Sequence, residues 1–279
     1  MAERHLTFKD ATVLSMYVDD QDDSDYRIQV DNRVRYVSVK PKVYDYSDIL
    51  CFPPLLIDNL PPFPAGDWTT MTVGRDEHGS LTRSISFKPL AAVTTVWHLK
   101  QIDVLSLRRV RRFNLRTYEV EWEDNKTAVA KIARFEFEIP QVERETQIYC
   151  ALSTLQTTTT TPTTTTWVPA FLGHLIENGR VMGLLIEKVE GRRAGIEDYD
   201  ACMQVVRRFH ESGFVHGDLN RYNFLIHEGE GKAEAEARVT LIDFENARIY
   251  DERLSNEELE GLGAQLKEET GRGGPAIPM

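Results

Sequence analysis

Long hydrophobic runs are absent from this sequence, and cysteines are few. No apolar stretch is long enough to cross a bilayer, and the opening residues, Met-Ala-Glu-Arg-His, do not have the pattern of a signal peptide. The three cysteines (Cys51, Cys150, Cys202) are odd in number and lack metal-ligand spacing, which indicates reduced thiols. An excess of positive charge is also absent, since the formal net charge is -11. We therefore expect a protein of the cytoplasm, with the nucleus left open, and no nucleic-acid or membrane partner.

The composition present is that of a globular protein, with 41% hydrophobic and 28% charged residues in a chain of 279. Residues 1–95 show alternating patterns without a chemical signature, and we interpret them as a β-rich extension. The runs 26–30 and 34–36 flank Asp31-Asn32 and predict a hairpin, and two more strands are predicted at 68–73 and 80–87. Five prolines between 53 and 64 predict an extended segment without regular helix.

Two polar motifs, each attached to a short apolar strand, dominate the second half of the chain. The first, Gly213-Phe-Val-His-Gly-Asp-Leu-Asn-Arg-Tyr-Asn-Phe-Leu-Ile226, predicts a loop that carries Asp218 and Asn223. The second, Val239-Thr-Leu-Ile-Asp-Phe-Glu-Asn-Ala247, puts Asp243 at the end of a strand. Such groups suit a metal-bound polyphosphate. Asp218 would accept the proton of an attacking hydroxyl, and Asn223 and Asp243 would supply oxygen ligands to Mg²⁺.

The segments His216-Gly-Asp-Leu-Asn-Arg-Tyr-Asn223 and Asp243-Phe-Glu245 resemble the catalytic loop (H-R-D-x-x-x-x-N) and the metal motif (D-F-G) of the protein-kinase-like superfamily. Glycine after the histidine is similar to the aminoglycoside and choline phosphotransferases and to the small atypical kinase of the tRNA threonyl-carbamoylation machinery. The resemblance implies an α+β, bilobal kinase-like fold that uses ATP and Mg²⁺. Its N-lobe would span 96–188 and a short helical C-lobe 189–279. In this reading His216 supports the loop by packing and hydrogen bonding.

A lysine inside an apolar strand-like run suggests a paired charge. Lys131 lies in the predicted strand 127–133, where an ammonium is costly unless it meets a phosphate or a carboxylate. The resemblance implies that it binds the α- and β-phosphates and pairs with a glutamate of the following helix. Glu145 lies on the apolar stripe of that helix and is the predicted partner, with Glu143 as the alternative. The competing interpretation of Lys131 is a surface lysine on an edge strand.

The passage Leu184-Leu-Ile-Glu-Lys-Val-Glu-Gly191 resembles the strand and hinge between kinase lobes. Ile186 would then close the back of an adenine pocket, and the backbone of Glu187 and Val189 would meet the base edge. The full set of nucleotide-binding residues implied by the resemblance is Lys131, Val129, Ile186, Glu187, Val189, Leu225 and Asp243.

Three further segments are assigned from local patterns. The threonine-rich run 157–166 predicts a flexible insertion, with a glycosylated stalk as the compositional alternative. A helix is predicted over 196–212, ended by Gly213. Ser255-Asn-Glu-Glu258 matches a capping box and predicts the start of a last helix there.

The resemblance, which covers about 96–260, also departs from the kinase pattern. Where a Gly-rich loop should cover the phosphates, residues 107–116 contain no glycine, so the backbone cannot approach the phosphates as it does in kinases. Arginines 108, 109, 111 and 112 would either replace backbone donors by charge or form a solvated hairpin. Glu245 replaces the motif glycine. Only about 36 residues follow Asp243, too few for a full activation segment, unless the gene product is truncated.

Three functions compete. The first is an ATP-dependent phosphotransferase whose acceptor is a hydroxyl of a protein or a small molecule. Asn220 stands where protein Ser/Thr kinases place lysine, which argues against a protein Ser/Thr hydroxyl as the acceptor. The second is a pseudokinase that keeps the fold, and with it nucleotide binding in some form, but serves as a binding module. The third, a metal-dependent hydrolase built on Asp218 and Asp243, lacks the additional histidines or carboxylates that such sites need.

Overall fold

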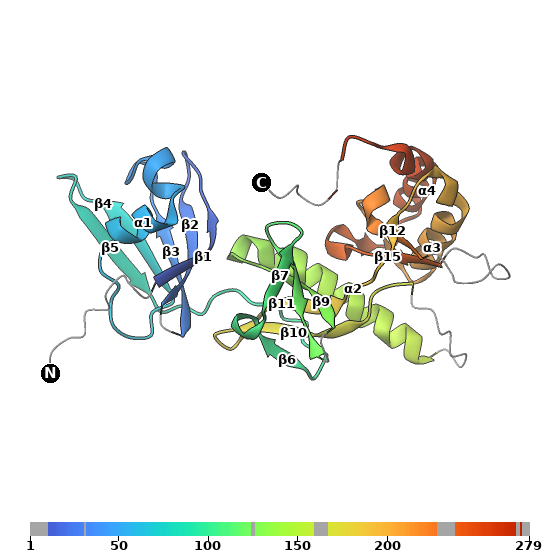
Figure 1. The fold of residues 1–279 in the computed structure, drawn as a ribbon, viewed down its shortest axis with the longest axis horizontal. Helices are drawn as coiled ribbons and strands as arrows, with labels where there is room; N and C mark the ends of the chain where they lie inside the picture. The colour runs from blue at the N-terminus through green and yellow to red at the C-terminus, as the bar shows by residue number, and fades with distance from the viewer. Residues whose placement is uncertain are drawn as a thin grey trace. The chain divides into compact units, whose positions relative to one another are not determined.

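The computed structural model describes residues 11–30, 32–123, 126–158, 167–227, 238–271 and 274. Asp31 of the predicted hairpin turn, the predicted turn at Asp124-Asn125 and residues 159–166 of the predicted threonine-rich insertion lie outside this set. The chain divides into two compact units (Figure 1). The first consists of Met1–Ala92 with Arg134–Glu136 and Asn178–Arg180, and the second contains the remainder.

The first unit is built on a five-stranded sheet of order β1-β2-β3-β4-β5. Its strands are β1 (Ala11–Tyr17), β2 (Ser24–Val30), β3 (Arg33–Val39), β4 (Thr70–Arg75) and β5 (Leu81–Ser86). The predicted hairpin is confirmed, since β2 and β3 pair antiparallel with Val30 opposite Arg33. The two later predicted strands are also present, at slightly shifted bounds. Tyr26, Arg27 and Ile28 of β2 are all fully buried, so both faces of the strand are covered at this point.

The proline-rich segment is not wholly extended, and this prediction was wrong. A turn of π-helix, η2 (Tyr46–Leu50), is followed by helix α1 (Pro53–Asn59). Pro53 and Pro54 occupy the first helical positions, where a backbone N–H has no intrahelical partner and its loss costs nothing. The helix buries Leu56 and Ile57 in the core of the unit.

The second unit begins with a six-stranded sheet of order β6-β10-β11-β9-β8-β7. Its strands are β6 (Gln101–Asp103), β7 (Arg109–Arg112), β8 (Thr117–Glu121), β9 (Thr127–Ile132), β10 (Phe171–Glu177) and β11 (Arg180–Glu187). Strand β9 is central, so that Lys131 lies opposite Thr117 of β8 and Leu184 of β11. A surface lysine on an edge strand is thereby excluded. After the 3-10 turn η5 (Glu136–Glu138), the sheet is followed by the predicted helix, α2 (Ile139–Thr158).

The mainly apolar run 102–107 does not form one continuous strand. Only β6 is extended there, and residues Val104–Ser106 form the 3-10 turn η3. The carboxylate of Asp103 accepts the backbone N–H of Leu105 at 2.8 Å and so caps this turn. The first strand of the hairpin that precedes β9 is instead β7, within the arginine-rich stretch.

The rest of the second unit contains helices α3 (Tyr199–Glu211) and α4 (Glu252–Lys267), small sheets and short turns. These smaller elements are β12 (Arg192–Arg193), η6 (Ile196–Asp198), β13 (Phe214–Val215), η7 (Arg221–Asn223), β14 (Phe224–His227), β15 (Arg238–Leu241), η8 (Phe244–Asn246) and β16 (Arg248–Ile249). The helix predicted over 196–212 is present as η6 and α3, and Cys202, Val206 and Phe209 of α3 are buried. Figure 1 shows α3 and α4 beside each other.

The capping box predicted at Ser255–Glu258 was wrong. Helix α4 starts one turn earlier, and the carboxylate of Asp251 caps it by accepting the N–H of Leu254 at 3.0 Å. Ser255 is buried within the helix and its hydroxyl contacts His210 of α3 at 2.8 Å. Ser255 and Glu258 instead lie on one face of α4, since residues three apart are neighbours on a helix.

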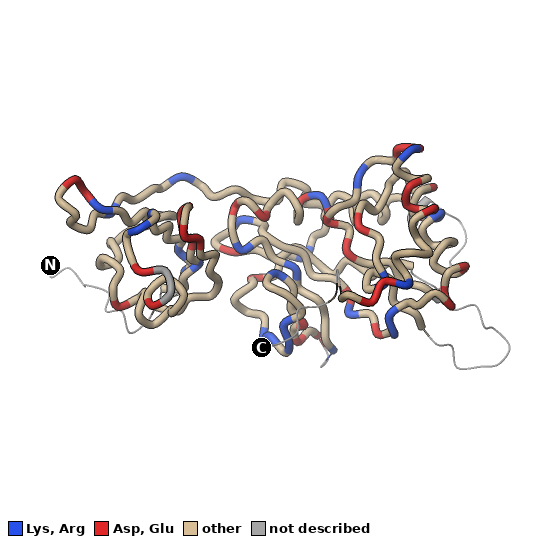
Figure 2. Tube along the Cα trace, turned by 90° about the horizontal axis from the view of Figure 1, so that it is seen from above, with Lys and Arg blue, Asp and Glu red and all other residues tan. Residues whose placement is uncertain are grey.

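The fold is thus of the mixed α+β class, as predicted. Residues of both charge signs are interspersed along the trace of each unit (Figure 2), so the net charge of -11 does not arise from one segment. In the part of the chain that the structure describes, no helix combines the length and the apolar character that a membrane crossing requires.

Candidate active site

Lys131 contacts a carboxylate of helix α2 and the aspartate of the second polar motif. Its Nζ lies 2.9 and 2.8 Å from the two carboxylate oxygens of Glu145 and 2.5 Å from Oδ1 of Asp243. The Glu145 side chain is 1% exposed and that of Lys131 12%. Strand β9 positions the ammonium, α2 positions Glu145, and the turn after β15 brings in Asp243. The predicted contact between Lys131 and Glu145 is therefore present, although the catalytic roles remain predictions.

The charges of this triad stabilise one another against the cost of burial. Burial alone would lower the pKa of Lys131, but the carboxylates of Asp243 and Glu145 outweigh it and hold that pKa above its ordinary value. Desolvation would raise the pKa of Asp243, but the Lys131 ammonium outweighs it and lowers that pKa. For Glu145 burial is the larger effect and raises its pKa, although Lys131 opposes it. Lys131 accordingly stays protonated. Of the two carboxylates, Glu145 is the one that is protonated first as the pH falls.

Asp243 has a backbone conformation that few residues other than glycine adopt. Its φ is 72° and its ψ 68°, in the left-handed region, and such strain concentrates at functional sites. Phe244 anchors the turn from the other side, since its ring is buried and stacks on Phe209 at a centroid distance of 5.2 Å. The turn thus holds the Asp243 carboxylate towards Lys131.

Glu245, which replaces the motif glycine, ties the turn to the rest of the unit. Its carboxylate contacts Arg116, just before β8, at 2.6 Å, and its carbonyl oxygen accepts Arg144 of α2 at 2.8 Å. The residue that adds negative charge near Asp243 is therefore neutralised by a guanidinium. No local pattern indicated this partner, because Arg116 and Glu245 are 129 positions apart.

The loop with Asp218 and Asn223 is fixed largely by hydrogen bonds to its backbone. Asn223 is buried, and its Nδ2 donates to the carbonyl oxygen of Asp218 at 2.9 Å, so its own oxygen stays available to a ligand. The ring of His216 is fully buried and its Nε2 donates to the carbonyl of Ile242 at 3.0 Å. Burial lowers the pKa of His216, so the neutral ring performs the supporting role that the resemblance implied.

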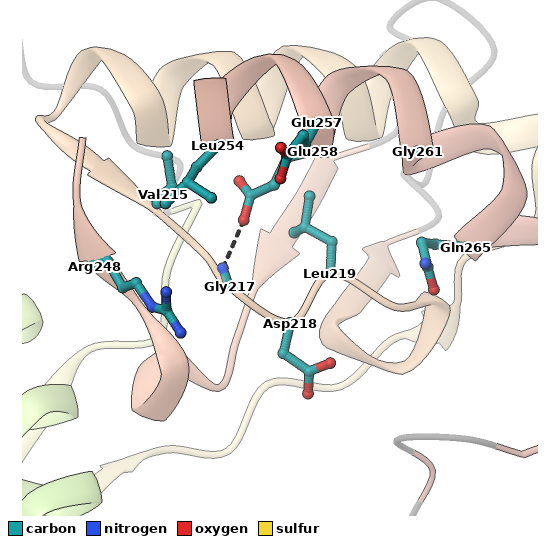
Figure 3. Close-up of a pocket in the computed structure, with 10 residues that line it drawn as sticks. All are labelled: Val215, Gly217, Asp218, Leu219, Arg248, Leu254, Glu257, Glu258, Gly261 and Gln265. Carbon is teal, nitrogen blue, oxygen red and sulfur yellow. Dashed lines mark hydrogen bonds between the residues drawn. The ribbon is translucent and has the colours of Figure 1, made fainter. Parts of the chain in front are cut away.

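Glu258 is a site residue that sequence reasoning missed. Its carboxylate accepts the backbone N–H of Gly217 at 2.6 Å, shown as a dashed line in Figure 3, and that of His216 at 3.2 Å. It also contacts Nε2 of His210 at 2.7 Å. Helix α4 thus holds the loop immediately before Asp218. In the sequence, Glu258 is only a glutamate three residues after Ser255. That spacing does not indicate a contact with a loop about forty residues earlier.

Gly217 is required by geometry in this loop. Its φ is +79°, and a Cβ built on it would lie 2.3 Å from the carbonyl oxygen of Asn246. No other residue has both the freedom to adopt this φ and the absence of a side chain at this contact. The glycine that distinguishes this motif from H-R-D is therefore a consequence of how closely the turn with Asp243 approaches.

A cavity of about 340 Å³ collects the predicted nucleotide-binding residues. It is lined by all seven of them (Lys131, Val129, Ile186, Glu187, Val189, Leu225 and Asp243) and also by Asn223. Glu145 and Asp218 are not among its lining residues. Glu145 lies behind Lys131, and Asp218 borders a second cavity described below. The volume is within the range of small-molecule sites, roughly 300–1,000 Å³.

The hinge offers this cavity only some of its backbone groups. The N–H of Glu187 donates to the carbonyl of Ala170 at 2.8 Å, so it is not available to a base edge. The carbonyl oxygen of Glu187 and the backbone of Val189 are then the groups that could meet one. The alternative helix carboxylate, Glu143, is occupied elsewhere, accepting the backbone N–H of Thr94 at 2.5 Å.

The hairpin that replaces a Gly-rich loop presents one of its four arginines to the cavity. Arg111 lines it, whereas Arg108 forms an ion pair with Glu121 and the Arg109 guanidinium lies 4.0 Å from the ring centroid of Tyr118. Within the described part of the chain, no ion-pair partner is found for Arg111. The hairpin is thus more than a solvated loop at this one position.

Oxygen donors suited to a divalent cation lie at the same place. Carboxylate oxygens of Glu145, Asp243 and Glu245 lie within 4.8 Å of one another. Two of these groups already contact the Lys131 ammonium, and the third contacts Arg116. Of the three, Asp243 is the one that faces the cavity, together with Asn223. These two residues fit a magnesium ion, which prefers a few carboxylate or amide oxygens and keeps water or phosphate for the rest.

Comparison with known proteins finds similarity to kinases. The model of the lipopolysaccharide kinase (Kdo/WaaP) family matches residues 187–272, less than half of the chain. The RIO-type serine/threonine-protein kinase Rio1 of Haloferax volcanii is 50% identical over 32 residues, which are 12% of this chain and 11% of that protein. The match thus spans about a tenth of the length of that curated relative. Both matches are to kinases, and together they support a protein-kinase-like superfamily and kinase-like phosphotransfer in general.

Proposed function

We propose that this protein is an ATP-dependent phosphotransferase that moves the γ-phosphate of Mg·ATP to a hydroxyl group. The observation that carries the proposal is the contact of Lys131 with both Glu145 and Asp243 at the wall of a cavity of small-molecule size. A buried ammonium held by two carboxylates leaves one carboxylate facing the cavity. This arrangement favours a ligand that is a polyphosphate with a bound cation.

In the proposed mechanism the sheet supplies the binding groups and the loop supplies the base. The six-stranded sheet with α2 would form an N-lobe and residues 189–279 a short C-lobe, with residues 1–95 as an added domain. The adenine would lie between Val129, Ile186 and Leu225. The ammonium of Lys131 would contact the α- and β-phosphates while Glu145 fixes its position. Asn223 and Asp243 would hold Mg²⁺, which would neutralise charge on the phosphates.

The transfer step needs only ATP and the acceptor. The acceptor oxygen forms a bond to the γ-phosphorus, the bond from that phosphorus to the bridging oxygen breaks, and ADP leaves with the electron pair. Asp218 orients the hydroxyl and takes its proton. In the absence of backbone donors from a Gly-rich loop, the guanidinium of Arg111 would contact the phosphates instead.

The pseudokinase interpretation is the second candidate, and one observation favours it. The hairpin of β7 and β8 carries no glycine, so the close backbone approach to the phosphates is not available. If this loss abolished transfer, the unit would still present a folded surface and a cavity to a partner. Binding and turnover therefore have to be measured separately.

A thermal-shift titration with Mg·ATP followed by an ATP-consumption assay tests the proposal. We expect Mg·ATP to raise Tm, because a ligand that binds only the folded state stabilises it by mass action. We expect phosphate transfer that is lost in Asp218→Asn while the thermal shift is kept. The matched control is Asp200→Asn, an exposed aspartate on α3. No thermal shift at millimolar nucleotide would overturn the proposal, and a thermal shift without any ATP turnover would support the pseudokinase.

A further inference from the structure

A second cavity of about 240 Å³ lies beside Asp218, and it differs from the one lined by Lys131 and Asp243. It is bounded by the loop that carries Asp218, by β16 and by α4 (Figure 3). The two cavities share no lining residue, yet Asn223 of the first donates to the carbonyl of Asp218 in the second. The candidate base thus belongs to a space separate from the proposed nucleotide site, as a base that activates a second substrate should.

The side chains of this second cavity divide into an apolar floor and a few polar groups. Val215, Leu219 and Leu254 supply the apolar part. Of the two glutamates, Glu258 is engaged by the loop backbone and Glu257 by Arg253 at 2.5 Å. Neither carboxylate is therefore well placed to receive a cation.

Arg248 is the basic residue of this cavity. It lines the cavity and is exposed, and no carboxylate or carbonyl of the described residues lies within bonding distance of its guanidinium. Figure 3 shows this guanidinium and the Asp218 carboxylate extending to the same side of the loop, away from α4. An arginine in that position recognises a carboxylate or a phosphate group, because its donors match those oxygens in geometry and charge.

We propose that this cavity is the acceptor site and that the acceptor is a small hydroxyl compound carrying an anionic group. This rests on the proposed phosphotransferase function. The hydroxyl lies at Asp218 and the carboxylate or phosphate of the acceptor lies at Arg248, on the side of the loop to which both side chains extend. The transfer is the one given above, in which the acceptor hydroxyl loses its proton to Asp218 and gains the γ-phosphoryl group.

Binding and transfer with a panel of simple alcohols test this proposal. The full chain with Mg·ATP is offered matched pairs, glycerol 3-phosphate against glycerol and gluconate against sorbitol, together with the cationic alcohol choline. Binding is measured by calorimetry with a non-hydrolysable Mg·ATP analogue in place, so that it does not depend on turnover. We expect the anionic member of each pair to bind and to react at least about tenfold better, as a charge-assisted contact predicts.

The variants separate Arg248 from its surroundings. Arg248→Ala should lower the affinity for the anionic alcohols about tenfold and leave ATP binding unchanged, and Arg248→Lys should recover part of it. Arg207→Ala is the matched control, since that arginine is exposed on α3 and does not line the cavity. Equal use of each pair, preference for choline, no effect of Arg248→Ala, or binding of Mg·ATP with no anionic alcohol bound would each overturn the acceptor proposal alone. Failure of Mg·ATP to bind would overturn the phosphotransferase as well.

Discussion

The carboxylate of Glu258 accepts the backbone N–H of Gly217 at 2.6 Å and thereby connects helix α4 to the residue before Asp218. The contact is made to the backbone, so it fixes the path of the loop that carries Asp218. The orientation of the proposed base thus depends on a helix that follows it by more than thirty residues.

Replacing this carboxylate should impair transfer more than nucleotide binding. In Glu258→Gln the amide offers one acceptor oxygen in place of two charged ones, and the loop loses one of its two anchors. We expect kcat to fall about 10- to 100-fold, because small displacements of a catalytic group have effects of this size. The thermal shift with Mg·ATP should change little. Glu260→Gln, at an exposed glutamate of the same helix that does not line the second cavity, is the control, and equal loss in both variants would contradict the assignment.

The same carboxylate should contribute to stability in a pH-dependent way. Burial would raise its pKa, but the hydrogen bonds from His210 and from the N–H groups of Gly217 and His216 outweigh this and lower it below the ordinary value of 4.5. The contribution is therefore fully present above pH 4.5 and is lost as the pH falls through the lowered, folded-state pKa.

Urea unfolding of wild type and Glu258→Gln across pH 3 to 7 measures this effect. We expect the variant to be about 2 kcal/mol less stable at pH 7, the usual size for charged hydrogen bonds, and the difference to shrink towards pH 3. A difference that stays constant across the range would show that the carboxylate is not the source.

The arginines of the β7–β8 hairpin should differ in their effect on nucleotide binding. Arg111 lines the cavity, whereas Arg108 pairs with Glu121. We expect Arg111→Ala to weaken Mg·ATP binding about tenfold and to leave adenosine binding unchanged, because adenosine has no phosphates. Arg108→Ala is the matched control and should weaken neither. Equal effects on ATP and adenosine would refute a phosphate contact.

The ion pair of Arg116 with Glu245 should stabilise the second unit. Both side chains are less than a quarter exposed, so the pair is screened less than a surface one. We expect a double-mutant cycle with Arg116→Ala and Glu245→Gln to give a coupling energy of about 1 kcal/mol in urea unfolding. Strictly additive effects would mean that the two charges do not interact in solution.

The sequence predicted those parts of the site in which a charged residue lies within an otherwise apolar segment. Lys131 within an apolar strand and Glu145 on the apolar stripe of a helix are both costly alone, and this cost indicated the pair that the structure contains. The direct contact of Lys131 with Asp243 could not be predicted from local patterns, because 112 residues separate them.

Other features could not be predicted, because local patterns suggested a simpler alternative. Ser255 and Glu258 match a capping box, yet both turn towards α3 and the loop, and only the packing of the two helices decides between these uses. Pro53 and Pro54 suggested an extended chain, although prolines also open helices. In both cases the sequence allows two structures and tertiary contacts select one.

The tight approach of Asn246 to Gly217 also limits how this chain can be brought under external control. In many signalling kinases a guanidinium at this position reads a phosphate on a nearby segment, but here any side chain would collide with the turn that follows Asp243. A single engineered substitution therefore cannot install such a switch. Both backbone segments would have to be redesigned together, and an engineer would do better to attach a regulatory module elsewhere on the surface.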